Sequence, residues 1–209
     1  MPQVGKEALS QFIRTECLRL LRLNLSPDAQ AFQQERTAAG MPPVQPPRPG
    51  LEYLAQAGEE WQAEKIADLS DTFGTAVVIG DRYTNQAGQE RFREIELVNH
   101  LNTAPQGSFL VESQFDVGPA FESALGIAGY RQNYALNYSR LRPDLIEVLP
   151  PTSNIDRYVT PAGAVLWLAA DDHRMKLRVI DIKLTAEPSP SYFAEVTYYS
   201  MALAGWLAD

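Results

Sequence analysis

The fold is decided by two stretches, LRPDLIEVL at residues 141–149 and LRVIDIKLT at residues 177–185. Both are rich in branched apolar residues, which predicts strands. Side chains alternate between the two faces of a strand, so Asp181 and Lys183 share one face of the second stretch. An unpaired carboxylate is costly in an apolar strand. We therefore expect Asp181 and Asp144, near the start of the first stretch, to lie together at neighbouring strand ends.

Two acids and one lysine form a minimal site for a divalent metal and for phosphodiester cleavage. Carboxylates are hard oxygen ligands of the kind Mg²⁺ binds. A bound metal makes hydroxide from water and neutralises charge on a phosphate. Lys183 is a point charge for the phosphate or for the attacking water. The alternatives are structural: Asp181 and Lys183 form an ion pair on a solvated strand, and Asp144 is a turn residue after proline.

Helices are predicted on both sides of these strands in the sequence. Residues 51–69 carry an apolar stripe at helical spacing, and Gln62 falls near the middle of that stripe. A buried amide needs a partner, so Gln62 is either a ligand or a satisfied core amide. Residues 191–207 form a second helix after Pro188 and Pro190. Residues 89–101 also show helical spacing, and residues 165–169 are expected to pair with residues 174–178 as a hairpin.

This order of elements resembles the PD-(D/E)xK nuclease superfamily. The letters PD stand at Pro143-Asp144, and DxK stands at Asp181-Ile182-Lys183. Within the superfamily the chain looks like the RecB/Cas4-like branch, in which a helix bearing QxxxY follows the DxK strand; here Glu195 to Tyr199 gives ExxxY. The branch also has a Gly-x-x-x-His/Glu helix, matched by Gly58 to Gln62 with a neutral amide at the ligand position.

The resemblance implies an α/β fold with a restriction-endonuclease-like core, a mixed sheet flanked by helices, and an N-terminal helical extension. It implies Mg²⁺ or Mn²⁺ bound by Asp144, Asp181, the Ile182 carbonyl and Gln62. Lys183 would contact the scissile phosphate or water, and Tyr199 would position DNA or brace the site. The residues expected to face the substrate are Arg142, Glu195 and Tyr199. Tyr199 is alternatively a core aromatic.

The function implied is that of a metal-dependent DNA nuclease. The alternative is a nuclease-fold module weakened at Gln62 that binds nucleic acid or a partner protein, and a third possibility is a pure assembly domain. The branch normally has a further strand after the ExxxY helix. Ten residues follow Tyr199, so we expect a fragment of a longer protein or a trimmed domain, acting beside a larger polypeptide, a helicase or an effector.

Two segments are expected along the chain. Residues 1–50 hold an N-terminal helix at residues 8–25 and a connector at residues 41–50 with five prolines, which favours an extended chain. Residues 51–209 form the nuclease-like domain. Cys17 lies on the apolar stripe of the first helix, which predicts a buried thiol.

Composition limits these expectations. The net charge of −8 argues against a nucleic-acid binder, but Lys and Arg outnumber Asp and Glu between Arg131 and Lys183, which allows a local groove. The single cysteine, Cys17, excludes an internal disulfide and an Fe–S cluster within this chain. There is no apolar run long enough to span a membrane and no secretion signal, so a cytoplasmic location is expected.

Overall fold

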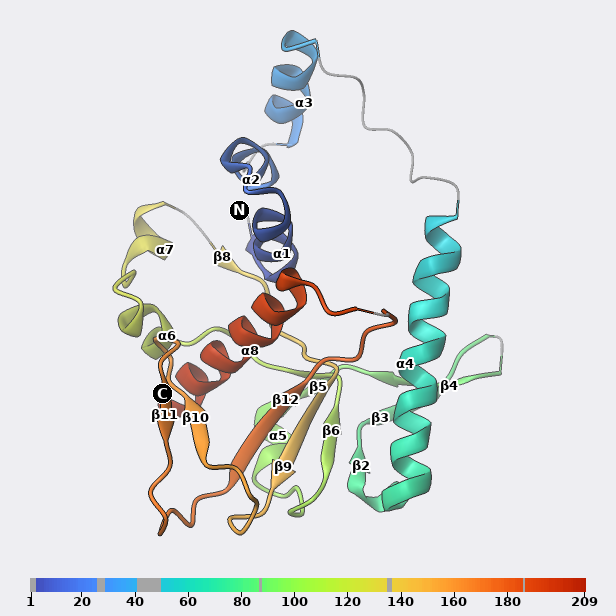
Figure 1. The fold of residues 1–209 in the computed structure, drawn as a ribbon. Coiled ribbons are helices and arrows are strands. Elements are labelled where there is room, and N and C mark those ends of the chain that lie inside the picture. The colour runs from blue at the N-terminus through green and yellow to red at the C-terminus, as the bar shows by residue number, and fades with distance from the viewer. Residues whose placement is uncertain (1–2, 26–28, 41–49, 87, 135–136, 186) are drawn as a thin grey trace.

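Residues 145–149 and 176–180 form neighbouring strands of a four-stranded sheet (Figure 1). The structure is a computed structural model that describes residues 3–25, 29–40, 50–86, 88–134, 137–185 and 187–209. Strand β12 (Lys176–Ile180) pairs antiparallel with β9 (Leu145–Leu149), and β9 pairs antiparallel with β6 (Phe109–Val111). Strand β2 (Val78–Ile79) pairs parallel with β6. The sheet is therefore mixed, in the order β12-β9-β6-β2.

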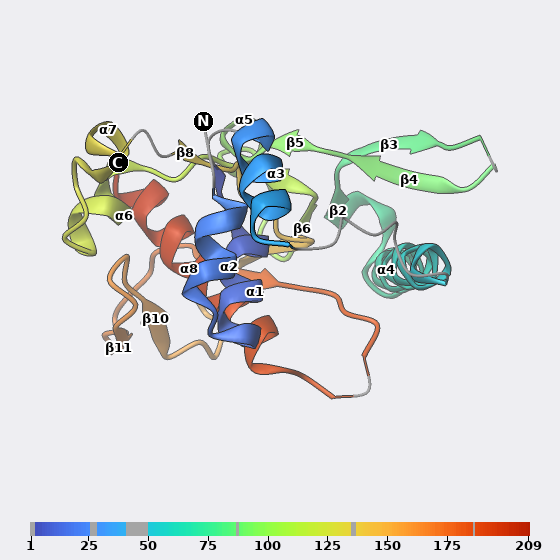
Figure 2. The ribbon, with the colours of Figure 1, turned by 90° about the horizontal axis from the view of Figure 1, so that it is seen from above.

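Helices cover both faces of this sheet. Alternation in β9 sends Ile146 and Val148 into one core cluster with Tyr199 and Leu203 of α8 (Pro190–Ala208). Leu145 points the other way, into a second cluster that includes Ile66 of α4 (Leu51–Phe73). A strand covered on both faces is apolar along nearly its whole length, which is the composition that β9 has. Figure 2 shows α8 and α4 apart from each other, with β6 and β2 between them.

The remaining elements surround this core. Helix α1 (Lys6–Thr15) packs on α8, and so does α6 (Pro119–Ala124). Hairpin strands β3 (Asp81–Thr84) and β4 (Glu90–Arg93) project beside α4 (Figure 2). The other helices of the described residues are α2 (Leu18–Asn24), α3 (Ala29–Ala38), α5 (Leu97–Leu101), α7 (Tyr130–Asn133) and a 3-10 turn at Thr75–Val77. The other strands are β1 (Gln3–Val4), β5 (Ile95–Glu96), β7 (Ser113–Gln114), β8 (Asn137–Tyr138), β10 (Arg157–Val159) and β11 (Val165–Trp167).

Several element predictions are wrong. The helix expected over residues 89–101 is instead β4, β5 and the short α5. Asn85 and Gln89 close a turn through the backbone, and pairing with β3 then makes residues 90–93 a strand. The strand β11 pairs with β10, while β12 pairs with β9, so the hairpin of residues 165–169 with 174–178 does not form. In both cases pairing between strands overrides the local pattern.

The N-terminal helix and the start of α4 also differ from expectation. Glu16 adopts a left-handed conformation at φ 49°, which ends α1 and separates it from α2. Cys17 follows this break and is exposed, so the prediction of a buried thiol is wrong. The first turn of α4 extends beyond the sheet, and its Leu51 and Leu54 are exposed. Of the proline-rich connector, residues 41–49 lie outside the described residues. Within the described residues, no helix combines the length and the apolar character needed to cross a membrane.

Candidate functional site

Asp144 and Asp181 lie at the same end of the sheet. Asp144 precedes β9 directly and Asp181 follows β12 directly. The two strands run antiparallel, with Ile180 opposite Leu145, so these flanking residues lie next to each other. The Ile182 backbone N–H donates to Asp144 Oδ2 at 2.5 Å. The expected meeting of the two acids is therefore present, although β12 ends at Ile180 and Asp181 to Lys183 continue beyond the strand.

The two carboxylates are buried and affect each other. Burial is the main cause that raises the pKa of Asp144, the Ile182 N–H opposes it, and the charge of Asp181 adds to it, bringing the pKa to about 6. The Asp181 side chain is 3% exposed. Its Oδ1 is buried and makes no well-directed hydrogen bond in the described residues, although Lys183 Nζ lies 3.0 Å away. A carboxylate oxygen held only by an ion pair at this depth can accept a cation.

Lys183 supplies a positive charge to this acidic group. Its Nζ lies 3.0 Å from Asp181 Oδ1 and 3.4 Å from Glu195 Oε2. Burial disfavours the charged ammonium, but the close contact with Asp181 and its charge, with the charges of Asp144 and Glu195, raise the pKa of Lys183 overall. The ion pair between Asp181 and Lys183, which was the structural alternative to a metal site, is therefore present. It does not sit on a solvated strand, because Asp181 is almost fully covered.

Helix α8 supplies two residues one turn apart. Glu195 is buried and pairs with Lys183, as described. The Tyr199 hydroxyl donates to the backbone carbonyl of Arg142 at 3.0 Å, and its side chain is 1% exposed. Tyr199 is thus a core aromatic that also braces the segment leading into Asp144. Its depth leaves little surface for direct contact with a substrate.

Gln62 reaches the site from α4 through Glu112. Gln62 Nε2 donates to Glu112 Oε1 at 2.8 Å, and Glu112 Oε2 lies 3.0 Å from Arg142 Nε. The Glu112 N–H donates to the Asp144 backbone carbonyl at 3.1 Å. Burial raises the pKa of Glu112, against the charge of Arg142 and the bond from Gln62. Glu112 has φ 52°, which is uncommon for a residue with a side chain.

A pocket of about 490 Å³ opens over these groups. Five of the predicted residues line it: Gln62, Arg142, Asp144, Ile182 and Lys183. Asp181, Glu195 and Tyr199 are not among its lining residues. Arg142 also pairs with Glu94. The arrangement therefore places two acids, a lysine, an arginine and an amide around one opening.

Two lining residues were missed by the sequence analysis, Glu112 and Lys6. Residues 108–117 read as one strand in the sequence, whereas β6 ends at Val111 and a backbone turn at φ 52° brings Glu112 to the pocket. Lys6 carries no signal in the sequence, because only the packing of α1 on α8 brings it here. Lys6 Nζ lies 5.6 Å from the centre of the Tyr199 ring. Of the acids flanking Gln62 on α4, Glu59 lines the pocket, whereas Glu64 is exposed and pairs with Lys65.

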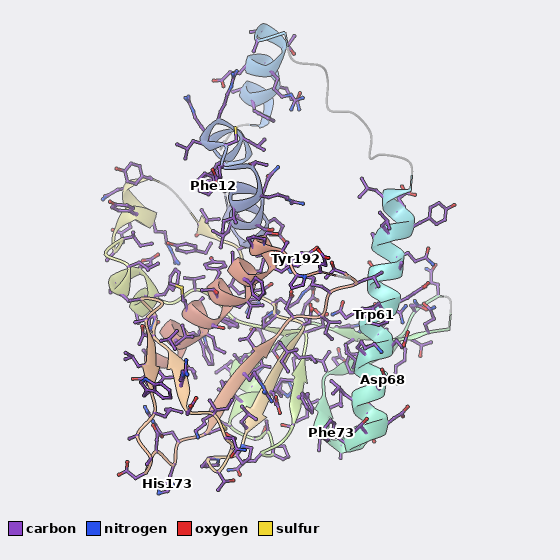
Figure 3. All side chains as sticks on the ribbon, in the orientation of Figure 1. Phe12, Trp61, Asp68, Phe73, His173 and Tyr192 are labelled. Atoms are coloured by element: carbon purple, nitrogen blue, oxygen red, sulfur yellow. The ribbon has the colours of Figure 1, made fainter. Side chains whose placement is uncertain are left out.

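Other metal-binding side chains do not gather here. Among the described residues no three His, Cys, Asp or Glu side chains form a group that could hold a metal ion. His173 lies at the far end of the sheet from Tyr192, whose ring is 5.9 Å from Lys183 Nζ (Figure 3). A cation at this pocket would therefore need amide or backbone oxygens in addition to Asp144 and Asp181.

Comparison of the chain with protein-family models, curated proteins and solved structures finds no match.

Proposed function

We propose that this chain is a metal-dependent DNA nuclease of the PD-(D/E)xK type, similar to the RecB/Cas4-like branch and built on a restriction-endonuclease-like core. One observation carries the proposal. Asp144 before β9 and the Asp181-Ile182-Lys183 segment after β12 meet at one sheet end, joined by the bond from Ile182 to Asp144. The surrounding pocket gives a phosphate access to Asp144 and Lys183.

The residues present suit a hard divalent cation. Burial and, to a smaller extent, the charge of Asp181 raise the pKa of Asp144, and Asp181 Oδ1 lacks a well-directed hydrogen bond in the described residues. Asp144 and Asp181 would hold the ion, with the Ile182 carbonyl and the Gln62 amide oxygen as neutral ligands. Both Mg²⁺ and Mn²⁺ take such oxygen ligands. A bound ion of this kind activates water and neutralises charge on a phosphate.

Side chains of the protein would bind the phosphate and hold the catalytic groups in position. Lys183 keeps its proton because three acids surround it, so it would contact the phosphate or orient the attacking water as a fixed positive charge. Arg142 lines the pocket and can share its guanidinium between Glu112 and a substrate phosphate. Glu195 and Tyr199 would position Lys183 and Arg142 and would not touch DNA themselves.

Cleavage of labelled DNA in Mn²⁺ or Mg²⁺ tests the proposal. We expect wild-type cleavage, and we expect Asp181→Asn and Lys183→Ala to abolish it while both variants stay folded. Lys65→Ala is the matched control, because Lys65 pairs with Glu64 and Asp68 on α4 and does not line the pocket. Equal cleavage by wild type and Asp181→Asn would overturn the assignment.

The second candidate is a nuclease-fold module that binds nucleic acid or a partner protein without cutting. It is favoured by the neutral Gln62, whose NH₂ group is already bonded to Glu112, and by the missing third acid or histidine among the described residues. If the chain binds DNA without metal and does not cleave it with any metal, the binding module is the correct function and the nuclease is not.

A further inference from the structure

The loop between β9 and β10 binds one lysine through three of its backbone carbonyl groups. Lys176, the first residue of β12, donates from Nζ to the carbonyl oxygens of Pro151 at 2.9 Å, Ile155 at 3.3 Å and Ser153 at 3.4 Å. An ammonium group has three N–H donors, so the three carbonyls match its full capacity. Rings of backbone carbonyls of this kind replace the hydration shell of a bound cation.

The sequence of the loop favours this arrangement. Pro150 and Pro151 follow β9 directly, and proline has a fixed φ and no N–H with which to continue the sheet. The Ser153 N–H donates to the Pro150 carbonyl at 3.0 Å and closes a turn. The residues whose carbonyls accept from Lys176 are half-buried, whereas residues 152, 154 and 156 between and after them are exposed.

Carboxylates do not neutralise the charge of Lys176 directly. No ion pair of Lys176 is formed within the described residues, whereas Lys65 and Lys183 both pair with acids. Asp172 feels the charge of Lys176 at longer range, but it pairs with Arg174. The loop carbonyls are therefore the direct partners of this half-buried cation. A neutral side chain would leave these oxygens without their donor, which is costly.

We propose that the loop of residues 150–156 is a cation site that the chain occupies with its own ammonium, and that Lys176 is a clasp whose charge holds this loop against β12. The loop leads into β10, which packs on α8 and pairs with β11. The clasp fixes the entry to this hairpin at the end of β9 away from Asp144. Removal of the charge frees the loop, and a free ammonium ion fits the place that the lysine leaves. The inference is independent of the proposed nuclease function.

Melting temperatures in two salts test the clasp. Lys176→Met removes the ammonium group and keeps an unbranched stem of nearly the same length. Lys65→Met is the matched control, because Lys65 pairs with carboxylates and not with a ring of carbonyls. Both variants and the wild type are melted in ammonium chloride and in tetramethylammonium chloride at equal ionic strength. Ammonium has N–H donors, and tetramethylammonium has none.

We expect Lys176→Met to melt roughly 5 to 10 °C below the wild type in tetramethylammonium chloride, because hydrogen bonds to a charged group are lost. Ammonium should restore part of this loss, and it should raise the melting temperature of Lys176→Met more than that of the wild type or of Lys65→Met. A melting temperature of Lys176→Met equal to that of the wild type would overturn the inference. So would a loss that ammonium does not relieve, because the stem of the lysine would then account for it.

A second measurement uses the folded wild type and so does not depend on the folding of Lys176→Met. Proton exchange of the lysine ammonium groups is followed by heteronuclear NMR, and Lys176→Arg identifies the Lys176 signal by its absence. We expect the Lys176 ammonium, which donates to three carbonyls, to exchange its protons more slowly than that of the partly exposed Lys65. Equal exchange rates would overturn the inference.

Discussion

At Asp144 the cost of burying a charge can be measured directly. Its folded pKa of about 6 lies above its ordinary value of 3.8, chiefly because it is buried. The folded chain therefore holds the proton more tightly than the unfolded chain, and stability falls as pH rises between those two values. We expect Asp144→Asn to raise the free energy of unfolding by up to about 3 kcal/mol at about pH 8, because each unit of pKa shift corresponds to about 1.36 kcal/mol. At about pH 4 the same substitution should have little effect.

Denaturant unfolding at the two pH values checks this prediction. Asp172→Asn is the control with the opposite sign. Hydrogen bonding to Arg174 lowers the pKa of Asp172 to about 2. The ionised form therefore contributes stability above its ordinary pKa and loses that contribution as pH falls. Asp172→Asn should lower stability slightly at neutral pH. A pH-independent effect of Asp144→Asn would contradict the account.

A substitution at Gln62 can distinguish a role as metal ligand from a purely structural role. In Gln62→Glu a new carboxylate would face Glu112, which now accepts a bond from Gln62. We expect a lower melting temperature without metal, because two close carboxylates repel. Mn²⁺ should reverse the loss and increase cleavage, because the new oxygen would join the metal ligands.

The matched control for Gln62 is Gln56→Glu. Gln56 also donates to a glutamate, Glu60, at 2.8 Å on the same helix, but the pair is exposed. A like-charge pair there should cost only about 0.2 to 0.5 kcal/mol, with no response to Mn²⁺. If Mn²⁺ does not raise the melting temperature of Gln62→Glu and the variant cleaves no more DNA than wild type, Gln62 is a core amide and not a metal ligand.

At the level of elements, α8 braces the site through one of two adjacent tyrosines. Tyr199 bonds the Arg142 carbonyl, whereas the Tyr198 hydroxyl is buried without a hydrogen-bond partner in the described residues. We expect Tyr199→Phe to cost about 1 kcal/mol, since the hydrogen bond from the buried tyrosine to the Arg142 carbonyl is lost. Tyr198→Phe should be neutral or stabilising, since a hydroxyl with no partner is removed from the core. Thermal unfolding of both variants decides this; equal losses would contradict it.

The elements also show what can be predicted from sequence. The branched apolar composition of residues 141–149 and 177–185 identifies the neighbouring strands β9 and β12, because both strands pack against the core clusters. It places Asp144, Asp181 and Lys183 together correctly. The pattern fails at residues 89–101, where pairing with β3 decides the structure. It also misses Glu112 and Lys6, which reach the pocket through a backbone turn at φ 52° and through the packing of α1 on α8.

At the scale of the whole molecule, an acidic chain holds a pocket lined by three basic and three acidic side chains. The N-terminal α1 contributes Lys6, the sheet contributes Asp144 and Asp181, and α4 contributes Gln62. No single segment contains the site. The expected boundary at residue 50 therefore divides the sequence only, because residues from both sides of it line the pocket.

Calorimetric titration of Mn²⁺ into the wild-type chain and into Asp181→Asn, at about pH 7.5 where Asp144 is ionised, measures whether Asp144 and Asp181 bind a divalent metal. We expect the wild type to bind Mn²⁺ at millimolar or lower concentration and to bind Mg²⁺ more weakly, because Mg²⁺ accepts a neutral amide less readily as a ligand. Asp181→Asn should lose binding. Affinity should also fall as Asp144 takes up its proton below about pH 6. No binding of either ion by the wild type, or equal binding by Asp181→Asn, would contradict it.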